Sequence, residues 1–381
     1  MYAKILEKEN NMRIIKKDTQ INYNDLAAKY GFINFNESLF FDIETTGFSS
    51  KSTKMYMAGV LYADSETGTF HTIQWFLEDY AEESALICEF LMFIKKYKCL
   101  IHYNGQGFDI PYIEAKCSSY NIIFDFSAFM HIDLYKYAAK LKNIFKTENL
   151  KQKTMETFFD LNREDIFSGG DLISVYYDFM EKRDERAAHF LLLHNYEDLK
   201  GMTTLVHILA YTNIFKQGYT FSSMTIESLT TSDGLKKKEA IIELHLNIPV
   251  PKRVSFGHQE FYMTAFNDKI RIKIQVYTDE LKYFYPNYKD YYYLPEEDMS
   301  IHKSVAFYVD KNFRTRAKAA NCYSKKTGQF LPQYQEVVSP YFKMEYHDKK
   351  MYFEATDEFQ KDTELICKYA DHILNRLMSV K

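Results

Sequence analysis

Two carboxylates stand at alternate positions of one apolar run. The segment Ser38 to Ile43 predicts a short buried strand, and the motif FDIETTG begins within it at Phe41. Because side chains alternate along a strand, Asp42 and Glu44 should project from the same face. Two acids buried together repel each other and are costly to desolvate unless cations accompany them. The pair favours a cation site on a sheet, although a solvated edge strand could carry the same pattern.

The segments around this strand alternate between strand and helix patterns. Strands are expected at 38–43, 54–62, 69–76, 99–103 and 131–134. Helices are expected at 81–97, from Asp109 onward, at 171–182 and at 184–211. The short turns between the first three strands imply an antiparallel meander, and the order βββαβαβα predicts an α/β domain.

Three regions are expected along the 381 residues. Residues 1–30 are polar and rich in Asn and Lys, which predicts a loosely ordered leader. Residues 31–212 form the α/β domain. Residues 213–381 consist of short alternating segments, among them 270–277, 304–309 and 350–354, closed by a helix at 357–378. This pattern of short alternating segments predicts a β-rich accessory domain of unknown role.

Charge and composition narrow the function classes only slightly. The residues from Phe215 onward carry 25 Lys and Arg against 22 Asp and Glu, and the rest carry 23 against 30. An acidic half beside a mildly basic half suits a carboxylate metal site joined to a surface that guides a nucleic-acid strand. The five cysteines are scattered without a C-x-x-C pair, so reduced thiols are expected. No run approaches the roughly 20 apolar residues of a membrane span, and the start lacks the pattern of a signal peptide, so a cytoplasmic protein is expected.

A third acid follows the fourth predicted strand. In the segment YNGQGFDIP two glycines permit a tight turn, and Asp109 stands at the start of the next helix. An ordinary helix N-cap would look the same. Asn104 and Phe108 sharpen the functional interpretation, because an amide and an aromatic ring beside an acid could grip a nucleotide end.

A fourth acid lies on the long amphipathic helix near residue 200. His194 and Asp198 are four residues apart, about one helical turn, and so share a face. An exposed His–Asp pair is the alternative. Tyr196 is a weaker candidate for the same chemistry, because residues two apart on a helix point in nearly opposite directions.

Together these segments resemble the DEDD (DnaQ-like) superfamily of 3′→5′ exonucleases. The resemblance is closest to the predicted ribonuclease H-like exonucleases of the YprB type, through FDIETTG, HYNGQGFDIPYI, HIDL, LKQKTMETFFDLNREDIFSGGDLISVYY and LLLHNYEDLKGM. It covers about residues 31–212. The implied fold is a ribonuclease H-like mixed five-stranded sheet flanked by helices.

The resemblance implies a hydrolase that removes nucleotides from 3′ ends with two divalent cations, Mg²⁺ or Mn²⁺. Asp42, Glu44 and Asp198 would hold the first cation, and Asp42 and Asp109 the second. His194 would orient or deprotonate the attacking water, although the spacing of the last motif is that of the branch with tyrosine in this place. Thr45, Thr46, Asn104 and Phe108 are the predicted substrate contacts, and single-stranded or 3′-end nucleic acid is the expected partner.

Two other function classes fit the same residues. One is a non-catalytic nucleic-acid-binding or scaffold protein on this fold, and the other is a metal-dependent endonuclease. Lys153, Thr154 and Glu156 could touch the substrate backbone, but they are interpreted as part of a solvated helix start. The segment 303–326 interleaves seven cations with aromatic residues, which suits single-stranded nucleic acid but also a β-ribbon with a buried aromatic side.

Overall fold

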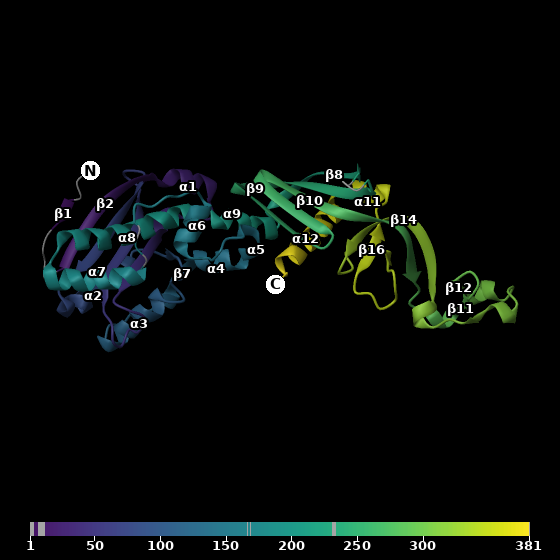
Figure 1. Cartoon of the computed structure of the whole chain (residues 1–381), viewed down its shortest axis with the longest axis horizontal. Helices are drawn as coiled ribbons and strands as arrows, with labels where there is room; N and C mark the ends of the chain where they lie inside the picture. Colours follow the sequence, from purple (N-terminus) through teal and green to yellow (C-terminus); the bar gives the residue numbers. More distant parts are fainter. Residues whose placement is uncertain (1–3, 7–11, 166, 168, 231–233, 381) are drawn as a thin grey trace. The chain divides into compact units, whose positions relative to one another are not determined.

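The computed structural model describes residues 4–6, 12–165, 167, 169–230 and 234–380. The chain forms two compact units, Met1–Thr212 and Asn213–Lys381. Figure 1 labels many of their helices and strands. In the described part of the chain, no helix is long and apolar enough to cross a membrane.

The first unit contains a seven-stranded mixed sheet in the order β1-β2-β5-β4-β3-β6-β7. Its strands are β1 (Lys4–Leu6), β2 (Met12–Asn22), β3 (Ser38–Thr45), β4 (Met55–Asp64), β5 (Thr69–Leu77), β6 (Cys99–His102) and β7 (Met130–Asp133). The strands from β3 to β5 form the predicted antiparallel meander, and β3, β6 and β7 run parallel. All five predicted strands are present in a mixed sheet, but the expected strand number of five is wrong, because β1 and β2 extend the sheet beyond β5.

The prediction of a loosely ordered leader is wrong for residues 12–29. Strand β2 pairs antiparallel with β5, from Met12 opposite Leu77 to Asp18 opposite His71. Helix α1 (Tyr23–Lys29) follows, capped by Asn22. Most side chains of β2 are at least partly exposed, and only Met12 and Ile15 are buried. A strand near the edge of a sheet buries few side chains. Its sequence can therefore be largely polar and lack the apolar pattern that predicts a strand.

Helices cover both faces of this sheet. The other helices of the unit are α2 (Glu83–Ile94), α3 (Asp109–Ser119), α4 (Leu134–Lys140), α5 (Lys142–Phe145), α6 (Gln152–Phe158), α7 (Gly169–Lys182), α8 (Glu185–Leu205) and α9 (Ile208–Thr212). Phe90 of α2 packs against Phe41 and Trp75 on one face. Asn195 of α8 contacts the opposite face, which carries Asp42. The carboxylate pair therefore lies under α8.

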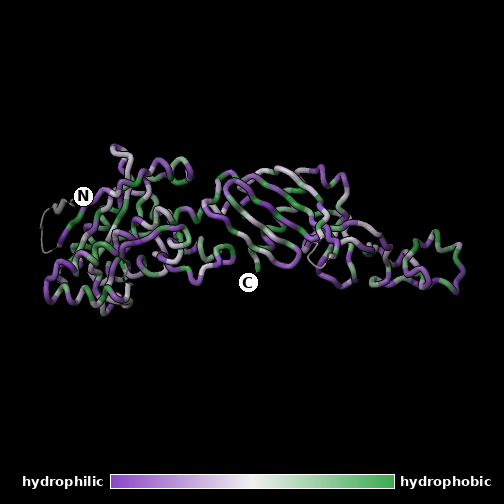
Figure 2. The backbone as a smooth tube through the Cα atoms, turned by 45° about the horizontal axis from the view of Figure 1, so that its top comes forward, coloured by the Kyte–Doolittle hydropathy of each residue, from purple (hydrophilic) through white to green (hydrophobic). Residues whose placement is uncertain are grey.

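The second unit is β-rich, as predicted. Its six-stranded sheet, β15-β16-β14-β10-β9-β8, is antiparallel throughout. The strands are β8 (Tyr219–Thr230), β9 (Lys236–His258), β10 (Phe261–Phe284), β14 (Tyr323–Gln333), β15 (Tyr341–Phe342) and β16 (Met351–Glu354). Helices α11 (Asp357–Lys361) and α12 (Thr363–Met378) close the unit, and α12 packs on β8, β9 and β10. Figure 2 shows hydrophobic and hydrophilic stretches interleaved along this sheet, as expected when one face is covered.

A smaller module is inserted between β10 and β14. It holds a three-stranded sheet of β11 (Tyr291–Leu294), β12 (Met299–His302) and β13 (Thr315–Arg316), with the short helix α10 (Lys303–Ala306). The predicted strand at 304–309 is wrong, because α10 and a turn occupy these residues. Alternating apolar residues favoured a strand there, but only Ala306 among them is buried.

Candidate active site

Strand β3 presents Asp42 and Glu44 from the same face, as its alternation requires. Glu44 is buried and Asp42 is partly exposed. Burial, together with the neighbouring Asp198 carboxylate, raises the pKa of both side chains well above the usual range. The predicted carboxylate pair is therefore inside the fold, and the solvated edge strand is excluded because β3 pairs on both sides, with β4 and β6.

Asp109 is brought to the same strand by the turn before α3. Its Oδ1 accepts a hydrogen bond from the backbone N–H of Ile43, at 3.3 Å. The side chain is buried, and this burial raises the pKa of Asp109 to about 7. Three acids from two separate segments thus gather around one stretch of β3.

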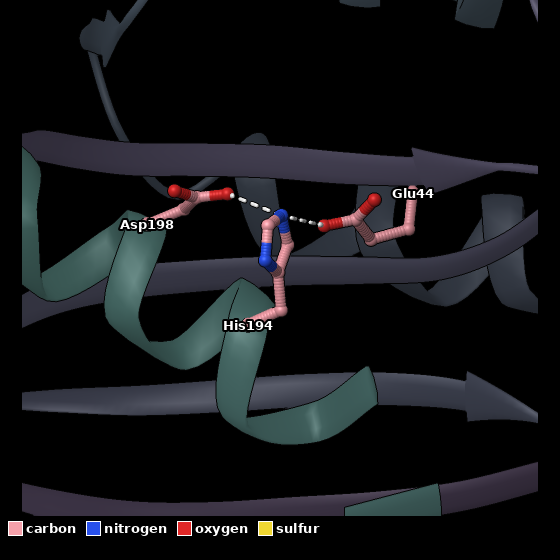
Figure 3. A group of neighbouring side chains, drawn as sticks. All are labelled: Glu44, His194 and Asp198. Atoms are coloured by element: carbon pink, nitrogen blue, oxygen red, sulfur yellow. Dashed lines mark ion pairs between the residues drawn. The ribbon is translucent and has the colours of Figure 1, made fainter. Parts of the chain in front are cut away.

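Helix α8 adds His194 and Asp198, one turn apart. Figure 3 shows the His194 imidazole between two carboxylates. Its Nε2 lies 3.2 Å from Asp198 Oδ2 and 3.7 Å from Glu44 Oε1. Atoms of Glu44, His194 and Asp198 all lie within 4.8 Å of one another, a grouping that could hold a metal ion. The structure therefore unites His194 and the four predicted carboxylates.

Asp165 is a further residue of the candidate site that the motif spacing did not single out. Its Oδ2 lies 2.6 Å from Nδ1 of His194, and the side chain is buried. Lys153 Nζ lies 2.6 Å from the same oxygen and keeps the pKa of Asp165 below its ordinary value despite burial. An ionised Asp165 accepts the N–H of Nδ1 and so fixes the tautomer of His194, with Nε2 directed at the carboxylates.

Arg163 is a second residue outside the predicted set. Its Nη2 lies 2.6 Å from Asp198 Oδ1, and its guanidinium also pairs with Glu156, a carboxylate that is 1% exposed. The solvated interpretation of Glu156 is therefore wrong. The Glu156–Arg163 pair fixes Asp198 from the side opposite His194. Both partners fall within the long motif LKQKTMETFFDLNREDIF, but no spacing rule places them beside Asp198.

Asn195 orients the first carboxylate. Its Nδ2 donates to Asp42 Oδ2 at 2.9 Å, while its Oδ1 accepts from Gln74 Nε2 at 2.9 Å. Gly59 stands opposite Asp42 in the sheet, and an added Cβ there would lie 2.0 Å from Asn195 Oδ1. The close approach of α8 to the sheet therefore depends on glycine at this position.

The donor set fits hard divalent cations. Four carboxylates and one imidazole converge, and oxygen-rich sets suit Mg²⁺ and Mn²⁺. Among the described residues, no lysine or arginine is ion-paired with Asp42, Glu44 or Asp109, and only Asp198 has such a partner. Raised pKa values at three of the acids follow from burial and mutual repulsion. Bound cations would relieve that repulsion.

The predicted substrate contacts fall into two groups. The hydroxyl of Thr45 donates to Gly47 O, and that of Thr46 accepts from Lys54 N, so both hydroxyls stabilise the turn after β3. Asn104 adopts a positive φ of 64° and is exposed, and its Oδ1 lies where a side chain at Gly107 would be. The structure leaves its amide accessible near Asp109.

Phe108 has an aromatic neighbour that the sequence did not suggest. The ring of Phe48, which is 90% exposed, lies 5.9 Å from that of Phe108 at 75°. Phe48 directly follows the FDIETTG motif. An apolar residue in a predicted turn was the one sequence feature that could have indicated an exposed aromatic ring here. The exposed Phe48 ring and the partly buried Phe108 ring form an aromatic pair next to Asp109.

Comparison with known proteins supports the fold of the first unit. Residues 39–210 match the model of the family RNase_H_2, described as RNase_H superfamily. The comparison with curated proteins gave no significant match. The first unit therefore has a ribonuclease H-like fold.

Solved structures of exonuclease I show a distant likeness. The E. coli enzyme in complex with a dT13 oligonucleotide is 13% identical, with a TM-score of 0.30, over 55% of this chain and 54% of that one. The zinc-bound E. coli ExoI–ssDNA complex is 14% identical, with a TM-score of 0.27, over 55% and 54%. The present chain thus spans about half the length of these proteins.

Proposed function

We propose that this protein is a metal-dependent 3′→5′ exonuclease of the DEDD type, acting on phosphodiester bonds at nucleic-acid 3′ ends. The observation that carries the proposal is the meeting of Asp42, Glu44, Asp109 and Asp198 beside His194. These residues come from three separate segments, and two of the acids are buried. Burying several acids together is unfavourable for a structural role, so the arrangement favours cation binding.

The four carboxylates would hold two divalent cations. Asp42, Glu44 and Asp198 would bind one cation, and Asp42 and Asp109 would bind the other. The cations would supply Lewis-acid stabilisation of the charge that develops during phosphodiester hydrolysis. Asn195 keeps Asp42 in a fixed orientation through its 2.9 Å hydrogen bond, and Arg163 does the same for Asp198.

His194 would receive the proton of the attacking water. With Nδ1–H held by Asp165, the lone pair of Nε2 faces Glu44 and Asp198. The water oxygen forms a bond to phosphorus, and the bond from phosphorus to the 3′ oxygen breaks. A nucleoside 5′-phosphate leaves, and the 3′ oxygen of the shortened strand takes a proton from solvent.

Exposed groups beside the acids would grip the strand end. The Phe48–Phe108 pair offers an aromatic surface for the terminal base. Asn104 is exposed in the bend that precedes α3, and its amide can form hydrogen bonds to the nucleotide. A surface of this kind next to an acid cluster suits a single-stranded end rather than an intact duplex.

Hydrolysis of labelled oligonucleotides tests the proposal. Single-stranded DNA and RNA labelled at either end are incubated with Mn²⁺, Mg²⁺ or EDTA. We expect stepwise, metal-dependent shortening from the 3′ end, and none with Asp42→Asn or Asp198→Asn. Cleavage of a circular strand would instead show an endonuclease. Binding without any cleavage would show a non-catalytic protein.

A further inference from the structure

The module between β10 and β14 ends in an exposed aromatic loop. Val305, Phe307, Tyr308 and Phe313 are 56%, 78%, 86% and 52% exposed. The Phe307 and Tyr308 rings lie 5.6 Å apart at 88° to each other. Large apolar side chains gathered on a short surface segment mark an interaction site more often than chance. We call residues 305–318 the tip loop.

The tip loop also carries more cations than acids. Between residues 305 and 318 it holds Lys311, Arg314, Arg316 and Lys318 against one acid, Asp310. The Asp310 carboxylate accepts from Asn312 N at 2.8 Å, as a helix cap. In the part of the chain that the structure describes, none of the four cations has a carboxylate within ion-pair distance. Lys311, Arg316 and Lys318 are exposed.

The tip loop rests on a well-supported base. The Arg314 side chain donates a hydrogen bond to the backbone oxygen of Ala306, the last residue of α10. This bond joins the two ends of the loop. The guanidinium carbons of Arg314 and Arg316 each lie 4.9 Å from the centre of the Tyr292 ring. Asp298 of the same module accepts hydrogen bonds from Tyr293 and from Tyr323 of β14, at 2.6 and 2.5 Å. These contacts fix the backbone from which the exposed rings project. Less conformational entropy is then lost when a ligand binds to the rings.

We propose that the tip loop binds single-stranded nucleic acid, with bases stacked on Phe307, Tyr308 and Phe313 and phosphates paired with Lys311, Arg316 and Lys318. Rings interleaved with unpaired cations match this ligand. The centre of a protein–protein interface is depleted in lysine, so this surface suits a folded protein partner less well. The tip loop is separate in sequence from the acid cluster. The inference rests on the proposed function and adds a second binding site for the same nucleic-acid strand.

Binding measured without hydrolysis tests this inference by itself. The full chain in EDTA is titrated against fluorescent dT20 and U20 strands, and fluorescence anisotropy gives the dissociation constant. We expect Phe307→Ser combined with Tyr308→Ser to weaken binding about tenfold or more. The matched control is Phe32→Ser, because Phe32 is 60% exposed and lies in the other unit. An unchanged constant, or an equal loss in the control, would overturn the proposal.

The cations have their own readout. Lys311→Gln combined with Lys318→Gln should lower the slope of log Kd against log salt concentration by about 1.4, since each phosphate contact on a single strand contributes about 0.7. Lys349→Gln is the control, because Lys349 is exposed and lies outside the tip loop. An unchanged slope would overturn the role of the lysines.

Two further measurements separate this inference from its rivals. The first is binding to vesicles of phosphatidylserine and phosphatidylcholine. If the chain binds these vesicles through Phe307 and Tyr308 but binds no strand, the tip loop contacts lipid and the proposal is overturned. Hydrolysis of the p-nitrophenyl ester of thymidine 5′-phosphate, which has no strand to reach the tip loop, should be unchanged in the tip variants. If the chain hydrolyses nothing, the proposed function fails while the EDTA binding result stands.

Discussion

At the scale of single residues, the two nitrogens of His194 have different partners. Nδ1 faces the buried Asp165, and Nε2 faces Asp198 and Glu44. We therefore expect His194→Gln to lower kcat by about 10²- to 10⁴-fold, the range for loss of a general base. Asp165→Asn should cost about 10- to 100-fold, the range for a partner that orients a site residue.

Metal titration distinguishes orientation from structural damage. Both variants should keep the circular dichroism of the wild type, while Asp165→Asn alters the Mn²⁺ concentration needed for half-maximal activity. Glu164→Gln, an exposed neighbour, is the control. Equal activity in Asp165→Asn and wild type would contradict the orienting role.

Glu156 and Arg163 form a buried pair whose loss should be costly. Both side chains are at most 7% exposed, and removal of one partner from a buried pair destabilises a protein by about 3–5 kcal/mol. We expect Glu156→Ala to lower the free energy of unfolding in urea by that amount. Restoring only the size of the side chain with Glu156→Gln should recover part of the loss, since Gln152 and Arg163 keep an acceptor. Wild-type stability in Glu156→Ala would contradict the pairing.

The sequence pointed to five residues that the structure brings together in the candidate site, but it did not reveal the residues that hold them in place. Asp42, Glu44 and the pair on α8 follow from the periods of strand and helix, which are local. Arg163 and Asp165 lie in an irregular segment, and they reach Asp198 and His194 only through the tertiary fold. No local periodicity encodes such contacts, and only the family resemblance drew attention to the segment.

At the scale of elements, the approach of α8 to the sheet is set by Gly59. A Cβ at this position would lie 2.0 Å from Asn195 Oδ1 and 2.8 Å from Leu199 Cδ1. We expect Gly59→Ala to lower the free energy of unfolding by about 1–3 kcal/mol through overpacking. It should also lower kcat, because Asn195 would lose its place beside Asp42.

Gly169→Ala is the matched control for this prediction. Gly169 opens α7, and an added Cβ there meets nothing within 4 Å. Alanine at this position should therefore be neutral or slightly stabilising. Urea denaturation and oligonucleotide hydrolysis of both variants give the comparison. A Gly59→Ala protein as stable and active as wild type would refute the packing argument.

His207, the residue before helix α9, is partly buried and contacts Tyr30, the residue after α1, and this contact makes stability depend on pH. Tyr30 Oη and His207 Nδ1 are 2.6 Å apart, and burial lowers the pKa of His207 to about 4. The unfolded value is about 6.5, so the folded state binds fewer protons between these values. The His207 contribution is therefore fully present above pH 6.5 and is lost as the pH falls towards 4.

His207→Gln isolates this contribution. Between pH 7 and pH 4.5 the wild type should lose up to about 2 kcal/mol more unfolding free energy than the variant. Urea denaturation at both pH values measures the difference, and acids common to both proteins cancel. Parallel losses in the two proteins would show that His207 does not titrate in this range.

Element prediction failed where burial is sparse. The paired residues of β2 and β5 lie 47 to 65 positions apart in the chain, and no local pattern reveals such a pairing. At 303–309 the apolar residues are mostly exposed, so their alternation reflects an exposed loop rather than a sheet face. Nearly all side chains of the strands β3, β4 and β6 are buried. Strands buried on both faces have long apolar runs in the sequence, which made these three predictable.

At the scale of the whole molecule, the acid cluster and the tip loop belong to different compact units. The main hydrophobic core of the first unit runs from Met12 to Leu191 and lies wholly within residues 1–212. A unit with its own core should fold alone. We therefore expect a fragment of residues 1–212 to unfold cooperatively and to hydrolyse the p-nitrophenyl ester of thymidine 5′-phosphate at the rate of the full chain.

The same fragment should bind long strands more weakly, because it lacks the tip loop. In EDTA, the fragment should bind dT20 at least as weakly as the full chain carrying Phe307→Ser and Tyr308→Ser. On a long labelled strand with Mn²⁺, it should release after fewer cleavages than the full chain, since one of two holding points is missing. Undiminished binding of dT20 by the fragment would place all strand contacts in the first unit. An insoluble fragment would instead show that the two units fold together.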